Sequence, residues 1–173
     1  MSFIYITGIE TAGKSTVCRE LKNRGFEAYD IDEGIAHYYD KATGEQSEWL
    51  GAAEARTSEW HETRAYMMDR SHVERIKAQA KDKPIFLCGT TQNDEIVLDL
   101  FDKLIYLYLD EDTLRDRMSK RSSTELAFAP HEQQAVLSWH KPCEDKYRKL
   151  GATMVDATQP NDKVIESILA AII

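Results

Sequence analysis

An apolar run that passes directly into a glycine-rich loop restricts the fold of this chain more than any other feature. Residues 2–7 read SFIYIT, and residues 8–16 follow as GIETAGKST. A short apolar run that ends at a glycine predicts a buried strand, and the segment after the loop predicts a helix that ends near Gly25. The loop fits the phosphate-loop pattern G-x-x-x-x-G-K-[ST]. The residues that match this pattern are Gly8, Gly13, Lys14 and Ser15.

The residue types of this loop suit the phosphates of a nucleotide. Glycines allow backbone N–H groups to converge on an anion, and a helix that starts near Lys14 directs its positive end toward that anion. Lys14 is expected to reach the β- and γ-phosphates of ATP, and the Ser15 hydroxyl is expected to bind Mg²⁺. Glu10 would repel a phosphate unless it faces an acceptor or solvent. The other loop residues expected to contact ATP are Gly8, Thr11, Ala12, Gly13 and Thr16.

Further apolar runs of strand length alternate with helical patterns. Residues 46–82 contain no proline and read as one long helix or two abutting helices. The alternation predicts one α/β domain over residues 1–173, with a five-stranded parallel sheet covered by helices on both faces. Counted along the chain, the expected strand order is 2-3-1-4-5, which puts the phosphate loop at the carboxyl edge of the central strand. The five expected strands are residues 2–7, 26–32, 84–89, 103–109 and 151–157.

Charge and cysteine content narrow the partners and the location. The net charge of −8 argues against a nucleic-acid binder, because neutralising phosphates needs a basic surface. No apolar stretch approaches the ~20 residues that cross a bilayer, so no membrane contact is expected. The three cysteines form no C-x-x-C pair, which favours buried thiols in a reducing cytosol. We therefore expect a cytoplasmic monomer or homodimer.

Two acidic segments compete for the role of holding the metal. In one interpretation, Asp110 and Glu111 follow a Walker-B strand, and the protein is an ATPase. In the other, Asp110 or Asp112 caps the next helix. The second segment is YDID, where Asp30 and Asp32 leave the second strand on the same side of it. Two carboxylates there suit one role beside the metal and one as a base toward an acceptor, although which is the base stays open.

The order of these motifs along the chain resembles the nucleoside-monophosphate-kinase and shikimate-kinase branch of phosphate-loop proteins. The resemblance spans nearly the whole chain through GIETAGKST, DID, LCGTTQN, RMSKR and VDATQP. It implies transfer of the γ-phosphoryl group of Mg-ATP to a small acceptor, which could be a nucleotide, a nucleoside or a hydroxylated metabolite. Lys14, Asp32, Arg117 and Arg121 would be catalytic, and Ser15 with Asp32 would hold the metal.

The same resemblance assigns the remaining parts of the site. Arg117 and Arg121 would open a lid over residues 122–132, and Ala157, Thr158, Gln159 and Pro160 would edge the adenine. A helical region at about 34–82 would bind the acceptor. It interleaves Arg56 and Arg64 with Trp49, Trp60 and Tyr66, a mixture that could stack a base and bind a monophosphate or could form a packed helix with a solvated charged face. The residues expected to bind acceptor are Asp30, Asp32, Arg56, Arg64, Gly89 and Thr90.

The chain departs from shikimate kinases at the turn after the third expected strand. Those enzymes carry three glycines there, whereas this chain reads Gly89-Thr90-Thr91. A clear match to their substrate-binding arginines is also missing, so shikimate is not the expected acceptor. The alternative to a kinase is a phosphate-loop ATPase or a nucleotide-binding regulator that acts on no small-molecule acceptor.

Overall fold

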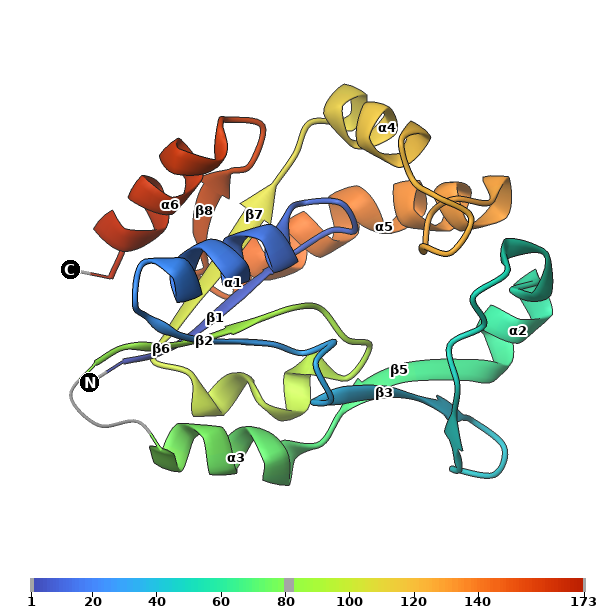
Figure 1. The fold of residues 1–173 in the computed structure, drawn as a ribbon, viewed down its shortest axis with the longest axis horizontal. Helices are drawn as coiled ribbons and strands as arrows, with labels where there is room; N and C mark the ends of the chain where they lie inside the picture. The colour runs from blue at the N-terminus through green and yellow to red at the C-terminus, as the bar shows by residue number, and fades with distance from the viewer. Residues whose placement is uncertain (1, 80–82, 173) are drawn as a thin grey trace.

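A five-stranded parallel sheet forms the centre of the computed structural model, which describes residues 2–79 and 83–172 (Figure 1). Its strand order is β2-β6-β1-β7-β8. These are the second, third, first, fourth and fifth of the expected strands, so the expected order is confirmed. The numbers differ because three strands of a second sheet intervene in the chain. The strands are β1 (Phe3–Gly8), β2 (Glu27–Asp30), β6 (Ile85–Cys88), β7 (Lys103–Tyr108) and β8 (Thr153–Asp156).

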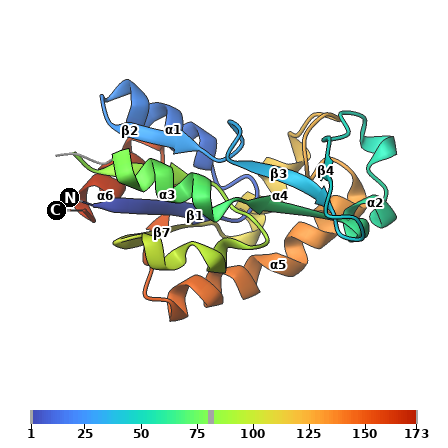
Figure 2. The ribbon, with the colours of Figure 1, turned by 90° about the horizontal axis from the view of Figure 1, so that it is seen from below.

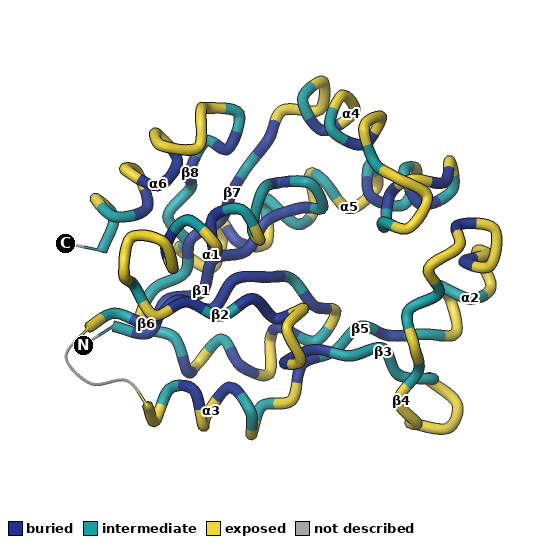
Figure 3. Tube along the Cα trace, in the orientation of Figure 1, coloured by how far each residue is buried: buried dark blue, intermediate teal, exposed yellow. Residues whose placement is uncertain are grey.

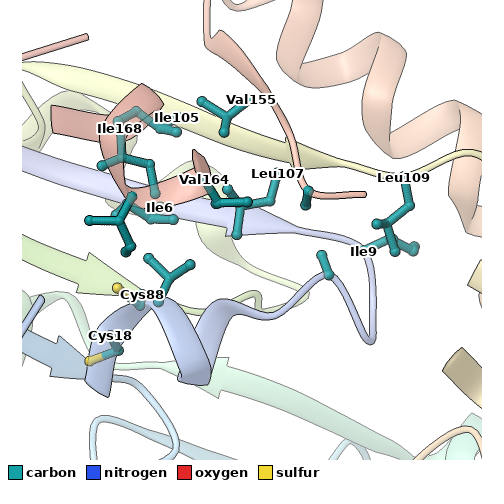
Figure 4. Close-up of a cluster of buried hydrophobic side chains, with 14 of the residues drawn as sticks. Ile6, Ile9, Cys18, Cys88, Ile105, Leu107, Leu109, Val155, Val164 and Ile168 are labelled. Carbon is teal, nitrogen blue, oxygen red and sulfur yellow. The ribbon is translucent and has the colours of Figure 1, made fainter. Parts of the chain in front are cut away.

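Helices cover both faces of this sheet, as expected. Alternation along β1 sends Ile4 and Ile6 into one apolar cluster and Phe3 and Tyr5 into another. The first cluster includes side chains of α1 (Lys14–Asn23), α4 (Glu111–Ser119) and α6 (Asn161–Ala170), part of which Figure 4 shows. The second includes side chains of α3 (Arg70–Gln79) and Tyr147 near the end of α5 (Pro130–Lys149). Because both faces are buried, the central strands read as continuous apolar runs (Figure 3).

The region at about 34–82, which we expected to be helical, contains a second sheet as well as helices, and its residues 80–82 lie outside the described ranges. Its three antiparallel strands lie in the order β4-β3-β5 and are β3 (Ala36–Asp40), β4 (Gln46–Ser47) and β5 (Arg64–Met68). Strand pairing places Tyr38 opposite Tyr66, with their ring centroids 4.7 Å apart. Aromatic pairs across two strands stabilise a sheet, and this contact outweighs the helical spacing that suggested a helix. The helical pieces that remain are η1 (Ala53–Ala55), α2 (Ser58–Thr63) and α3.

The small sheet and α2 extend away from the end of the molecule where the two termini lie (Figure 2). Between α4 and α5, residues 122–129 are neither helix nor strand, and α5 begins at Pro130. The expected lid at 122–132 therefore consists of an irregular segment and the first turn of α5. Two short turns, η2 (Asp94–Ile96) and η3 (Leu98–Leu100), connect β6 to β7. None of the helices in the described ranges has the length and apolar character needed to cross a bilayer.

Candidate active site

The phosphate loop joins the carboxyl end of β1 to the start of α1. Gly13 caps α1 with φ 95°, a left-handed conformation that glycine adopts without steric cost. Thr11 has φ 64°, which is uncommon outside glycine and shows that the loop holds a strained turn. The Lys14 ammonium donates to the carbonyl oxygens of Gly8 at 3.0 Å and Ile9 at 2.8 Å, so the lysine folds over its own loop.

A cleft of about 570 Å³ opens above this loop, between the ends of β2 and β6 and the start of the lid. It brings together most of the residues that the sequence predicted for the site. Gly8 and Ala12 are buried residues of the loop and do not line the cleft. The predicted residues that line it are Thr11, Gly13, Lys14, Ser15, Thr16, Asp30, Asp32, Gly89, Thr90, Arg117 and Arg121.

Two carboxylates meet the phosphate loop in this cleft. Asp30 ends β2 and is 8% exposed, and its Oδ1 accepts a hydrogen bond from the Asp32 amide at 3.1 Å. Asp32 reaches further out, and its Oδ1 accepts a hydrogen bond from the Tyr66 hydroxyl. Partial desolvation in the cleft raises the pKa of Asp32, and the Tyr66 hydrogen bond opposes that shift. With the Ser15 hydroxyl, these carboxylates supply the oxygen ligands that Mg²⁺ prefers, so the residues present fit this ion.

The turn after β6 supports the phosphate loop. Thr90 Oγ1 donates to the Gly8 carbonyl oxygen at 2.8 Å and lies 2.7 Å from Thr7 Oγ1. Gly89 has φ 154°, and a Cβ atom there would come within 2.1 Å of Ile31 Cγ1. Both residues therefore have a structural role, because Thr90 holds the turn against β1 and Gly89 allows it to pack against Ile31. Their expected contact with an acceptor stays a prediction.

Arg117 ties the phosphate loop to the segment after β8. Its guanidinium donates to the carbonyl oxygens of Thr11 at 3.1 Å and Ala157 at 2.7 Å. The segment expected to edge the adenine is not part of the cleft wall, but Arg117 connects its first residue to the loop. Asp156 shapes the segment, since its Oδ1 accepts from the Thr158 amide at 3.0 Å and its Oδ2 accepts from Gln159 Nε2 at 3.2 Å. Pro160 caps the helix that follows.

Arg121 pairs with Glu10, the acidic residue of the phosphate loop. Its Nη2 lies 2.8 Å from Glu10 Oε1, and its Nη1 lies 2.6 Å from Glu125 Oε1. Glu10 therefore faces the beginning of the lid and does not point back toward the phosphate-binding amides. Both carboxylates line the cleft together with this arginine.

The structure corrects the expectation for Arg56. This side chain is fully buried, and its Nε forms an ion pair with Glu132 Oε1 at 2.8 Å. Its remaining nitrogens donate to backbone carbonyl oxygens, including those of Leu50 at 2.9 Å and Glu125 at 2.8 Å. The guanidinium also lies over the Trp49 ring, 4.4 Å from its centroid. Arg56 thus fastens the lid segment to residues 49–56 and has no nitrogen directed at the cleft.

Arg64 also lies away from the cleft. It forms an ion pair with Asp40 at 2.9 Å and donates to Ser47 Oγ at 3.1 Å, within the small sheet. Pairing of β3 with β5 puts Arg64 opposite Asp40, so its charge is neutralised across the strands. The expected contact of Arg64 with an acceptor is not what this geometry provides.

The two interpretations of Asp110 are separated by its hydrogen bond. Its Oδ1 accepts from the Thr113 amide at 2.7 Å, which makes it the N-cap of α4. This hydrogen bond holds the pKa of Asp110 below its usual value. Among the described residues, the carboxylates beside Lys14 in the cleft include Asp30 and Asp32 but not Asp110. The helix-cap interpretation is confirmed.

A second cavity of about 460 Å³ adjoins the first, and the sequence did not predict it. Its walls come from β3, β4, β5 and the lid, and three aromatic residues (Tyr38, Trp49 and Tyr66) form part of them. Asp32 lines both cavities. Pairing of β3 with β5 brings Tyr38 and Tyr66 together, and Trp49, which follows β4, stacks on Tyr38. The aromatic residues interleaved with arginines in this region were the signal for an acceptor site.

Two histidines surround the buried carboxylate that pairs with Arg56. His61 Nε2 lies 2.9 Å from Glu132 Oε1, and His131 Nε2 lies 2.7 Å from the Arg56 carbonyl oxygen. Burial opposes ionisation of Glu132, but Arg56 and His61 outweigh that effect and keep its pKa below the usual value. This network therefore holds a charged carboxylate inside the protein.

Solved structures of small-molecule kinases resemble the whole chain. Shikimate kinase from Acinetobacter baumannii in complex with shikimate superposes with a TM-score of 0.63 at 18% identity, covering 99% of this chain and 93% of that one. Deoxyadenosine kinase from M. mycoides with bound dATP gives 0.59 at 18% identity and covers 99% of each chain. A gluconokinase from Sinorhizobium meliloti 1021 gives 0.54 at 15% identity, covering 99% and 91%. At these identities, the likeness establishes the fold.

Sequence comparison gives the family. No curated protein sequence matches this chain significantly. The family model AAA_18, described as an AAA domain, matches residues 4–135, which include the phosphate loop, the small sheet and the lid. The expected resemblance to phosphate-loop kinases is confirmed at the level of fold, and the chain belongs to the AAA_18 family of AAA domains.

Proposed function

We propose that this protein is an ATP-dependent phosphotransferase that moves the γ-phosphoryl group to a hydroxyl of a small acceptor. The observation that carries this proposal is the position of Asp32, which lines both the phosphate-loop cleft and the adjoining cavity. A carboxylate at that junction can contact an acceptor hydroxyl next to a nucleotide's terminal phosphate. A hydrolase or a regulator would not need a second cavity joined to the first in this way.

The chain's own residues fit Mg-ATP on the donor side. The amides of the phosphate loop, with Lys14, would hold the phosphates, and Ala157–Pro160 would edge the base. We place Ser15 and Asp30 beside the metal, in place of the Ser15 and Asp32 that the resemblance implied, because Asp30 lines the first cavity and not the second. When bound, Mg-ATP supplies the transferable phosphoryl group and a divalent charge that offsets the negative charge of the phosphates.

Asp32 then takes the role of base. It would accept the proton of the acceptor hydroxyl as that oxygen bonds to the γ-phosphorus and the bond to ADP breaks. The raised pKa of Asp32 makes it a stronger proton acceptor than an ordinary aspartate. Lys14, Arg117 and Arg121 would stabilise the charge on the transferring group. Arg121 would have to exchange one of its carboxylate partners for phosphate as the lid closes.

The expected location, oligomeric state and partners belong to the same proposal. We place the enzyme in the cytoplasm, as a monomer or homodimer without a nucleic-acid or membrane partner. Its three cysteines are free, and two of them are buried, which suits a reducing compartment. The net charge of −8 supports small-molecule over nucleic-acid substrates.

ADP release with Mg-ATP and a panel of hydroxyl acceptors tests the function. Lys14→Met should abolish acceptor-dependent turnover, while the exposed Lys149→Met serves as the matched control and should leave it unchanged. Asp32→Asn should lower kcat by about 10²–10⁴-fold while ATP still binds, because the loss of a general base affects the chemical step. ATP hydrolysis that no acceptor accelerates would overturn the kinase proposal in favour of an ATPase.

A further inference from the structure

We propose that the acceptor carries no negative charge: it is an uncharged, hydroxyl-bearing ring compound, and Glu10 enforces that selection. This inference rests on the proposed phosphotransfer and names the substrate class that the second cavity would admit. It follows from the walls of that cavity, from their charges and from the partners of Arg121.

The walls of the second cavity offer flat, partly apolar surfaces. Tyr38 is stacked with Trp49 at a centroid distance of 5.4 Å and packs against Tyr66 at 4.7 Å. All three residues are half-buried, so part of each ring stays exposed to the cavity. A volume of about 460 Å³ lies within the range of small-molecule pockets. Aromatic walls of this kind suit a ring with an apolar face, such as the base of a nucleoside or the face of a sugar.

The charged groups of the same cavity are predominantly negative. Four carboxylates line it (Glu10, Asp32, Glu48 and Glu125), whereas Arg121 is the one lysine or arginine among the described residues of its wall. These negative charges also act on the tyrosines: burial, followed by the charges of Glu10 and Asp32, raises the pKa of Tyr38. An acceptor with a carboxylate or phosphate would therefore enter against several like charges.

The single arginine is paired with carboxylates here, and the proposed phosphoryl transfer would direct any nitrogen that it frees to the phosphate of ATP, so it does not serve an acceptor anion. Glu10 occupies its Nη2 at 2.8 Å and Glu125 occupies its Nη1 at 2.6 Å. The Glu10 and Arg121 side chains are only 28% and 22% exposed, so solvent and salt screen this pair less than a surface pair. Glu10 lies in the phosphate loop and lines both cavities, which places its charge at the junction where an acceptor must sit.

Matched acceptor pairs that differ in charge test the inference. The pairs are nucleosides with their 3′- and 5′-monophosphates, so that each hydroxyl is free in one of the two anionic members, and methyl esters of uronic acids with the free acids. Transfer from γ-labelled ATP is measured for each compound, and binding is measured by calorimetry with a non-hydrolysable ATP analogue present. We expect kcat/KM to favour the neutral member by at least about 10-fold, since like charges brought together cost that much or more. Comparison of the two kinds of pair distinguishes a nucleoside from a sugar acceptor.

Variants that remove one carboxylate each test whether the negative charges of the cavity cause the preference for neutral acceptors. Glu10→Gln should free one side of Arg121 and narrow the preference against the anionic member. Glu48→Gln should narrow it as well, because Glu48 lines the second cavity and not the first. Glu45→Gln removes an exposed charge of the same segment that lines neither cavity, and it should leave the preference unchanged.

The possible outcomes separate this inference from the proposed function. Equal or better turnover of anionic members would overturn the inference and leave the kinase proposal intact. Binding of neutral members without phosphoryl transfer would support the inference and contradict the kinase proposal. Failure of every neutral member to bind or react would overturn the inference, and a preference unaltered in Glu10→Gln would remove Glu10 as its cause.

Discussion

Replacement of Arg56 by methionine distinguishes a structural arginine from a substrate-binding one. The guanidinium is fully buried and lies 2.8 Å from Glu132, whose side chain is equally buried. Removal of one member of such a pair leaves an uncompensated buried charge and costs about 3–5 kcal/mol. For a domain of this size, each kcal/mol lowers the Tm by about 2–4 °C, so Arg56→Met should lower it by about 6–20 °C.

Thermal unfolding by calorimetry measures this effect, and Arg115→Met is the matched control. Arg115 is exposed and pairs with Glu111 on the same helix, an arrangement worth about 0–1 kcal/mol. The double variant Arg56→Met/Glu132→Leu should recover much of the lost stability, because it leaves no unpaired charge in the interior. A Tm shift no larger than that of Arg115→Met, together with a raised KM for an acceptor, would refute our reasoning and restore Arg56 as a binding residue.

Three further predictions concern the cap, the turn and the base. Asp110→Ala should lower the free energy of unfolding by about 0.5–2 kcal/mol in chemical denaturation and leave kcat unchanged. Asp110→Asn, which still caps the helix, should have almost no effect on stability. A large loss of kcat in both variants would revive the Walker-B interpretation. Gly89→Ala should cost about 1–3 kcal/mol, because its Cβ would overlap a packed isoleucine, while Gly51→Ala, which has open space around it, is the control and should cost less than half as much. Tyr66→Phe removes a hydrogen bond that lowers the pKa of Asp32, so that pKa should rise further and the acidic limb of the kcat/KM profile should move to higher pH. A limb that stays in place or moves to lower pH would show that Asp32 is not the base.

The donor side of the site was predictable because its parts are local or lie at strand ends. Gly13, Lys14 and Ser15 are adjacent in the sequence, and their loop must follow a buried strand and begin a helix. Asp30 and Asp32 were predictable for a related reason, because the carboxyl ends of neighbouring parallel strands meet at one edge of the sheet.

The acceptor side depended on contacts that the sequence does not mark. Arg56 pairs with Glu132 across 76 residues of chain, and nothing in the spacing of arginines and aromatic residues reveals that such a charge is buried. Strand β5 was mistaken for helix because the apolar residues of segment 46–82 fall at mostly helical intervals, whereas its tyrosine pairs across the small sheet with a tyrosine of β3.

Glu10 illustrates the difference between what the sequence determines and what the tertiary structure decides. The sequence by itself determined a phosphate loop, a parallel sheet in a definite order and two acidic residues at its edge, since each follows from local pattern and strand connectivity. The tertiary structure alone decided that Glu10 faces Arg121, that Arg56 is interior and that the second cavity is aromatic and negative. The physical reason is that an ion pair or a cavity wall is defined by residues distant in sequence, whose approach is fixed only when the whole chain packs.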